Sequence, residues 1–286
     1  MNRVLVHVFL VLLSVTVLLH EVDASADRVP ILARWYQSVG KPLPGEGFGQ
    51  FLSRVAQARI DTPYWEASDT TGAEALAVEL DHFECVSFLE SSLAVARCAW
   101  RGKPTEGCFV WEVAGFRYRS GLMSNYASRL HYFVDWLEDN GGRWRLKNIT
   151  DELGGRPVAR DFFYLTRRAA RVPALSAPSL RRSMTAIEAD LSSRQHSVLG
   201  RNSIRSALDA MQDGDLIAVA GNRPGHLITH AGFVVKGEGE RARLLHASSY
   251  HRRVVVTRED VADYVMRRPA RTGVIVARPL PPKKTQ

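Results

Sequence analysis

The hydrophobic period changes near residue 213, and this change constrains the fold more than any other feature of the 286-residue sequence. Before it, apolar residues recur at helical spacing, for example Phe48, Phe51, Leu52 and Val55. After Asp213 they alternate in short segments, which is typical of strands. Helices first and short strands afterwards indicate an α+β protein rather than a doubly wound parallel sheet. We therefore predict an antiparallel sheet packed on N-terminal helices.

The predicted elements form a single domain over residues 27–286, because no internal repeat or low-complexity tract divides the chain. Residues 279–286 are a polar, proline-rich tail that we expect to be frayed. The predicted helices cover residues 31–38, 48–60, 83–100, 125–139, 162–170, 186–191 and 203–211. The predicted strands cover residues 216–220, 230–236, 243–247, 252–257 and 273–277.

The first 26 residues have the features of a secretory signal peptide (residues 1–26). An apolar run over residues 4–19 follows Arg3, and Ala24-Ser25-Ala26 supplies a small-x-small cleavage pattern. The run is short for a membrane-spanning helix. We expect cleavage after Ala26 and a periplasmic or secreted protein with no stable membrane insertion; an uncleaved anchor is the alternative.

The composition excludes a disordered or fibrous chain, since 45% of the residues are hydrophobic and 24% are charged. The formal charge of +8 favours anionic partners, although a basic surface is also ordinary for a soluble protein. An exported protein rarely meets nucleic acid, so we expect no nucleic-acid partner. Anionic wall polymers or substrates with several carboxylates are the more specific interpretation. The sequence sets no oligomeric state.

Three cysteines are an odd number for an exported chain. The segment between Cys98 and Cys108 is turn-like, with Gly102 and Pro104, so the two sulfurs either form a disulfide or remain as two buried thiols. In both cases Cys85 is left over. An unpaired thiol in an oxidising compartment calls for an explanation.

Cys85 and two histidines have the types and positions that cysteine catalysis needs. Cys85 lies near the start of a predicted helix, where backbone N–H groups favour a thiolate and stabilise an oxyanion; the alternative is a small buried side chain. His230 opens one predicted strand and His246 closes the next, so antiparallel pairing brings them together. His230 follows Cys85 within the roughly 130–150 residues typical of papain-like chains. A thiol, a base and an orienting group are the parts of nucleophilic catalysis.

A zinc site is the alternative for the histidines. His226 and His230 are four residues apart, and His246 would be a third ligand. However, Pro224 and Gly225 precede a strand-like segment, and the chain has no His-Glu-x-x-His motif. We therefore expect no metal and no organic cofactor. The other histidines considered are interpreted as surface or packing residues: His82, His131, His196 and His251.

Several segments together resemble one known family, over about residues 47–280. In this order they are similar to the bacterial N-acetylmuramoyl-L-alanine amidase-like domain family, a branch of the NlpC-type papain-like cysteine hydrolases. The segments are Asp61-Thr62-Pro63-Tyr64-Trp65, Phe83-Glu84-Cys85-Val86-Ser87-Phe88-Leu89-Glu90, residues 126–136, Asp213-Gly214-Asp215, His230-Ala231-Gly232-Phe233-Val234 and His246-Ala247-Ser248.

The resemblance implies a papain-like, NlpC-type core and hydrolysis of the amide between N-acetylmuramic acid and L-Ala in peptidoglycan or muropeptides. It implies Cys85 as nucleophile, His230 as base and His246 as the third polar residue. The family usually has Asp before the nucleophile, where this chain has Glu84, and this departure leaves the peptide specificity open. The substrate-binding residues implied by the matched segments are Tyr64, Glu84, Ser87, Arg129 and Tyr132.

Two other functions stay open on the sequence. One is an endopeptidase of the same fold that cuts inside the stem peptide. The other is a catalytically silent peptidoglycan-binding domain, which a basic surface would suit.

Overall fold

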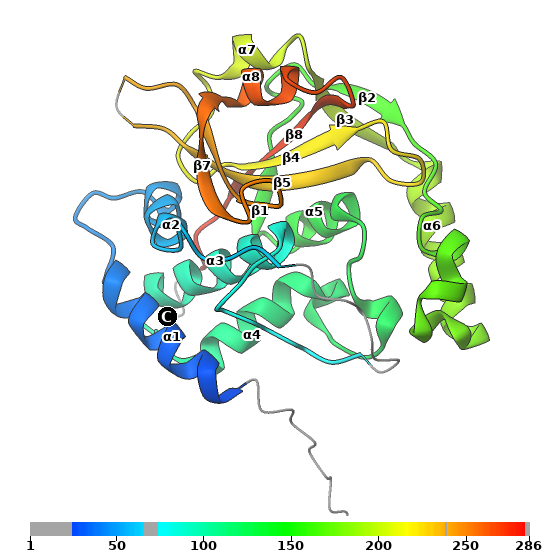
Figure 1. Cartoon of the computed structure of the whole chain (residues 1–286), viewed down its shortest axis with the longest axis horizontal. Helices are drawn as coiled ribbons and strands as arrows, with labels where there is room; N and C mark the ends of the chain where they lie inside the picture. Colours follow the sequence, from blue (N-terminus) through cyan, green and yellow to red (C-terminus); the bar gives the residue numbers. More distant parts are fainter. Residues whose placement is uncertain (1–24, 66–73, 238, 284–286) are drawn as a thin grey trace, which may run out of the picture.

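The fold has one sheet with helices on both faces (Figure 1). The computed structural model describes residues 25–65, 74–237 and 239–283, so the predicted signal sequence lies almost wholly outside the described residues. One face is covered by α1 (Ser25–Val39), α2 (Phe48–Gln57), α3 (Cys85–Trp100), α4 (Glu106–Arg117) and α5 (Phe133–Gly142). The other face is covered by α7 (Ile204–Ala207) and α8 (Val261–Met266), while α6 (Pro178–Ser193) lies to one side. Within the described ranges, no helix has the length and apolar character needed to cross a bilayer.

The sheet is antiparallel throughout its described pairs, which confirms the predicted mixed α+β architecture. Its order is β2-β3-β8-β4-β5-β6-β7, and β1 also pairs with β8. All five predicted strands are present, with ends that differ by at most three residues. The strands are β1 (Leu146–Asn148), β2 (Arg156–Ala159), β3 (Gln195–Gly200), β4 (Leu216–Gly221), β5 (Ile228–Val235), β6 (Arg243–Ser248), β7 (Arg253–Asp260) and β8 (Arg271–Pro279).

Alternation along β4 builds two separate apolar clusters. Leu216, Ala218 and Ala220 face the cluster that includes α2 and α3, whereas Ile217 and Val219 face the cluster that includes α7 and α8. Successive strand side chains point to opposite faces, and here both faces are buried. The sequence of β4 is therefore a short run of consecutive apolar residues.

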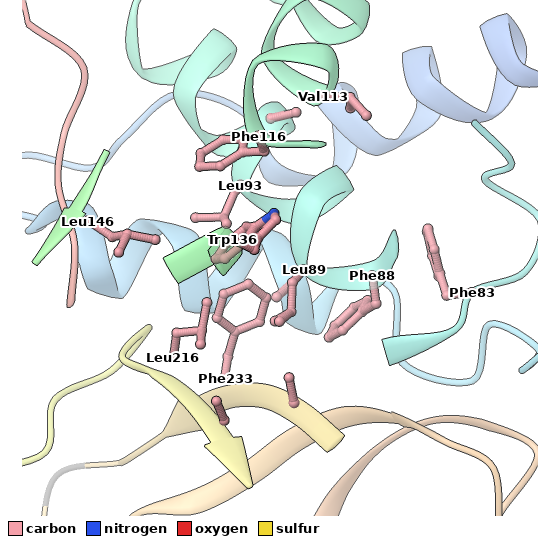
Figure 2. Packing of buried hydrophobic residues seen from close by; sticks show 14 of the residues in the cluster. Phe83, Phe88, Leu89, Leu93, Val113, Phe116, Trp136, Leu146, Leu216 and Phe233 are labelled. Atoms are coloured by element: carbon pink, nitrogen blue, oxygen red, sulfur yellow. The ribbon is translucent and has the colours of Figure 1, made fainter. Parts of the chain in front are cut away.

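α3 is buried on nearly all sides, because it lies between the other helices and the sheet. Figure 2 shows Leu93 of this helix between Phe116 of α4 and Trp136 of α5, and Leu89 beside Phe233 of β5. Each side chain is at most 1% exposed, and burying one contributes about 1.5–3 kcal/mol. This packing fixes the first residue of α3 beside the sheet.

The helix predicted over residues 125–139 is wrong in its extent. It is divided into a short 3-10 helix, η2 (Tyr126–Ser128), and α5. Between them the Leu130 N–H donates to the Arg117 carbonyl, 2.9 Å away, so the backbone bonds to the end of α4 instead of continuing the helix.

The helix predicted over residues 162–170 is likewise reduced to a 3-10 helix, η3 (Thr166–Arg171). The Glu188 carboxylate accepts the N–H groups of Leu165 and Thr166, which replaces helical bonds at that point. The sequence did not predict α4, α8 or the strands β1 to β3. Two further 3-10 helices are η1 (Arg119–Gly121) and η4 (Pro173–Ser176).

The start of the predicted tail is hydrogen-bonded to the domain, whereas residues 284–286 lie outside the described residues. Pro279 belongs to β8, and the Leu280 N–H donates to the Arg145 carbonyl. Nearby, Cys98 in the last part of α3 forms a disulfide with Cys108 in the first turn of α4.

Candidate active site

Cys85 is the first residue of α3, and the residues around it form the helix cap. The Glu84 carboxylate accepts the N–H groups of Val86 at 2.8 Å and Ser87 at 2.5 Å, and the Ser87 hydroxyl accepts the Glu84 N–H at 3.0 Å. This reciprocal arrangement is a capping box, which satisfies N–H groups that lack helical partners. Glu84 and Ser87 therefore define where the helix starts and hold Cys85 there.

His230 on β5 and His246 on β6 are in direct contact. Nε2 of His230 lies 2.5 Å from Nδ1 of His246, and the ring planes are nearly perpendicular. Gly232 permits this approach of the strands, because a Cβ there would lie 2.7 Å from the Leu245 carbonyl oxygen and 2.9 Å from the His246 Cβ. A larger residue at this position would push the strands apart.

Cys85 and His230 line one cavity of about 250 Å³. The backbone N–H of Ala231, the neighbour of His230, lowers the pKa of the Cys85 thiol. The remaining wall is largely aromatic and includes Tyr126 and Phe162. The structure therefore brings the predicted nucleophile and base to one small recess.

Both histidines are neutral at pH 7. Burial, followed by the positive charge of Arg271, lowers the pKa of His230 from 6.5 to about 4. Burial, followed by His230 and Arg271, lowers the pKa of His246 to about 2. A neutral His230 can donate one ring proton to His246 and keep the other nitrogen free to accept a proton.

The Cys85 thiol differs from the sequence expectation. Burial and then the neighbouring Glu84 carboxylate raise its pKa well above 9.0, whereas the helix N-terminus was expected to favour the thiolate. The physical reason is burial of the thiol first, and second that the Glu84 carboxylate already occupies the positive end of the helix. The resting site thus holds a neutral thiol beside neutral imidazoles.

Tyr132 lines the same cavity, but its hydroxyl is engaged elsewhere. It donates to the Glu188 carboxylate at 2.5 Å and accepts the Leu165 N–H at 3.2 Å. Its ring packs edge-on against Phe162. Tyr132 therefore shapes the apolar wall of the recess.

Tyr64 and Arg129 lie outside the lining of this cavity. Tyr64 is buried beneath the Arg252 guanidinium, which lies 5.4 Å from the ring centre. Arg129 pairs with Tyr118 through an isolated backbone bridge. Tyr64 also forms a backbone bridge with Phe83, two residues before Cys85. Burial, followed by the charge of Arg129, lowers the pKa of His131, which lines the recess. Both residues thus lie near the recess without lining it, and their part in substrate binding stays a prediction.

Sequence reasoning missed two residues that support the histidine pair. The Tyr264 ring of α8 lies 5.4 Å from the His246 ring, and the Arg271 guanidinium lies 3.8 Å from the centre of the Tyr264 ring. No sequence motif identifies Tyr264 or Arg271, and α8, which carries Tyr264, was not predicted. Their proximity arises only when α8 packs on the sheet.

His226 lines the cavity, with its ring packed edge-on against Tyr164. In the part of the chain that the structure describes, no three His, Cys, Asp or Glu side chains gather as a metal site.

The chain is similar to several proteins of known structure. The model of the family described as N-acetylmuramoyl-L-alanine amidase-like matches residues 54–274. An N-acetylmuramoyl-L-alanine amidase from Bacteroides uniformis is 26% identical, with a TM-score of 0.75 over 81% of this chain and 98% of that one. A putative xylanase from Bacteroides fragilis is 29% identical, with a TM-score of 0.72 over 78% of this chain and 98% of that one.

A Legionella pneumophila protein of the DUF1460 family shares the fold at 16% identity, with a TM-score of 0.66 over 92% of this chain and 97% of that one. No curated protein matches the chain. The family match covers most of the sequence and includes Cys85, His230 and His246. The chain therefore belongs to the N-acetylmuramoyl-L-alanine amidase-like family, whose members are related to peptidoglycan hydrolysis.

Proposed function

We propose that the protein is a cysteine-dependent amidase that cleaves the amide between N-acetylmuramic acid and L-Ala in peptidoglycan or muropeptides. The observation that carries the proposal is the shared recess of Cys85 and His230, with His246 bonded to the far nitrogen of His230. Membership of an amidase-like family supplies the substrate class. The neutral side chains are the reactants from which a thiol–imidazole mechanism starts.

In the first step the Cys85 sulfur attacks the amide carbonyl while its proton moves to Nδ1 of His230. Nε2–H of His230 donates to His246, which keeps Nδ1 available as the base. The imidazolium then gives its proton to the leaving amine, and a thioester remains on Cys85. A water molecule, deprotonated by His230, hydrolyses the thioester and releases the acid.

Two backbone donors at the sulfur favour this chemistry. The Cys85 N–H and the Ala231 N–H both lower the pKa of the thiol, against the larger and opposite effect of burial. The next two N–H groups of α3 are already bound by Glu84. The Cys85 N–H is thus the donor that we assign to the oxyanion.

The aromatic wall supports the muramoyl half of the substrate as the occupant of the recess. A volume of about 250 Å³ is small for a ligand pocket, and aromatic side chains such as Tyr126 and Phe162 in its lining suit a sugar ring. A long peptide would need more room on this side of Cys85.

We also infer that the chain is exported, that the signal peptide is removed after Ala26, and that residues 27–286 act as one catalytic domain. Membership of a cell-wall amidase-like family supports a location outside the cytoplasm. Mass spectrometry of the protein from its native envelope should give a mature chain that starts at Asp27. A chain that retains Met1 would contradict this inference.

The reaction is tested by incubating the protein with purified muropeptides and weighing the products. We expect free N-acetylmuramic acid derivatives and stem peptides that begin with L-Ala. Iodoacetamide should abolish the activity and EDTA should not. Products cut within the stem would identify the endopeptidase instead. Binding without any cleavage, by wild type and by Cys85→Ala alike, would identify the silent binding domain.

A further inference from the structure

A second recess begins on the other side of the histidine pair. A cavity of about 510 Å³ is lined by His230, His246 and Tyr264. It shares His246, Tyr264, Arg268 and other residues with a larger cavity of about 820 Å³ that follows β7 and α8. We call the two together the arginine groove, defined by Arg223, Arg253, Arg258, Arg267, Arg268 and Arg271.

The charges in the arginine groove are poorly neutralised. Among the described residues that line it, Glu259 is the one acid, and it is paired with Arg267 at 2.7 Å; Arg253 is paired with Asp61, outside the lining, at 3.4 Å. Among the described residues, Arg258 and Arg268 have no carboxylate within 4.0 Å, although both are exposed. Arg271 contacts the Tyr264 ring and backbone carbonyl rather than an acid. A concave surface with one sign of charge concentrates anionic ligands.

Guanidinium groups bind carboxylates through paired, charge-assisted hydrogen bonds. The peptide stem of a muropeptide carries several free carboxylates, whereas the sugar half of the scissile amide carries none near that bond. The arginine groove therefore matches the peptide half by charge, as the aromatic recess matches the sugar half by shape.

The position of the groove agrees with the direction of the reaction. The acyl carbon of the amide must reach Cys85, while the leaving amine must receive its proton from His230. His230 lines both the aromatic recess and the start of the groove. The leaving amine stays on the Cys85 side of His230, where Nδ1 gives it the proton, and the stem beyond the amine would run past His230 into the groove.

We propose that the arginine groove binds the carboxylates of the peptide stem, and that Arg258 and Arg268 determine the preference for substrates whose stem carboxylates are free. This inference rests on the proposed function, because it takes the stem as the leaving half. It adds a specificity-determining site to the chemistry at Cys85.

The test compares two muropeptides that differ only in whether their stem carboxylates are free or amidated. For the double variant R258Q/R268Q, we expect kcat/KM on the free acid to fall about ten- to a hundredfold, mostly through KM, since charged hydrogen bonds are lost. Its kcat/KM on the amidated substrate should equal that of wild type. The matched control is R182Q, which removes an exposed arginine of α6 outside the groove and should change neither value.

Equal losses on both substrates, or no loss on either, would overturn the proposal. Calorimetry of the two muropeptides with the Cys85→Ala protein measures binding without cleavage. It therefore separates failure of the groove proposal from failure of the proposed reaction. If wild type cuts neither substrate, weaker binding of the amidated muropeptide, with the difference abolished by R258Q/R268Q, would still support the groove. The proposal would also be overturned if R258Q/R268Q weakened the binding of a phosphate-bearing wall polymer but left muropeptide binding unchanged.

Discussion

The two ends of α3 are built in opposite ways. At its first residue, Cys85 is held by a capping box, and its sulfur is a free thiol. At its last turns, Cys98 is bonded covalently to α4, and Arg97 binds Glu112 at 3.0 Å. One end presents a reactive atom to a cavity, whereas the other is fixed by strong contacts.

Glu112 shows how the fixed end works. Its side chain is fully buried and is shared by Arg97, Arg101 and Arg145. Burial raises its pKa, but the three positive charges outweigh burial and keep the pKa below its usual value. The comparison teaches that rigidity at one end of a helix can hold the proposed nucleophile at the other, where tight contacts would block the substrate.

The largest expected effect is at the catalytic end. Cys85→Ala removes the nucleophile, so kcat/KM on muropeptides should fall by at least about 10⁴-fold. The melting temperature should stay close to that of wild type, because the substitution is small and breaks no ion pair. A Cys85→Ala protein that hydrolyses muropeptides at the wild-type rate would refute the cysteine mechanism.

The next largest effect is expected at the fixed end. Glu112→Gln leaves three arginines around a neutral buried amide, and it should lower the free energy of unfolding by about 3–5 kcal/mol. The kcat of the folded protein at low temperature should be unchanged. Denaturant unfolding measures the first quantity and a steady-state assay the second. The control is Glu106→Gln on the same helix, whose partly exposed pair with Arg28 is worth about 1 kcal/mol.

His246→Ala tests orientation rather than proton transfer. Without an acceptor at Nε2, His230 can adopt the wrong tautomer, and kcat should fall about ten- to a thousandfold. His246→Asn should restore part of the loss, since its side-chain oxygen can accept the same hydrogen bond. His230→Ala should be nearly as severe as loss of the nucleophile. Equal losses for Ala and Asn at position 246 would point to packing instead.

The sequence predicted the sheet better than the helices. The strands of the C-terminal half follow one another along the chain, so local alternation was sufficient to find them. α4 was missed although Phe109, Val113 and Phe116 have helical spacing, because the segment begins with turn residues and contains the buried Glu112. A glutamate buried in this way is stable only because arginines from other parts of the sequence pair with it. No local sequence pattern reveals those arginines.

The candidate site was predicted in part for the same reason. Cys85, His230 and His246 lie in recognisable segments, and the strand pairing that joins the histidines follows from a short connection. Tyr264 and Arg271 come from elements whose positions depend on tertiary packing. The neutral thiol was also unpredictable, because burial at this helix end exceeds the effect of the helix dipole.

Removing the disulfide tests the fixed end again, with a smaller effect. The double variant Cys98→Ala/Cys108→Ala should lose about 2–3 kcal/mol of stability, the value for a short closed loop. Its kcat below the melting temperature should match that of wild type. Alkylation of the folded, unreduced wild type should label Cys85 alone. Labelling at all three cysteines would show that the bond is absent in solution.

The smallest expected effect concerns the charge beside the nucleophile. The Glu84 carboxylate raises the Cys85 pKa in addition to burial, so Glu84→Gln should lower that pKa. The thiolate is the reactive form, and a lower pKa increases its fraction at any pH below the pKa. The rate of alkylation by iodoacetamide should therefore rise several-fold, and its increase with pH should begin at lower pH.

This last variant also separates charge from capping at the catalytic end. The amide oxygen of the introduced glutamine can still accept one of the N–H groups of Val86 and Ser87, so the loss of stability should stay near about 1 kcal/mol. Glu106→Gln, at the start of α4, is again the control and should leave alkylation unchanged. If Glu84→Gln alkylates no faster than wild type, burial alone sets the Cys85 pKa. The two ends of α3 would then differ in packing and not in the charge placed at the cap.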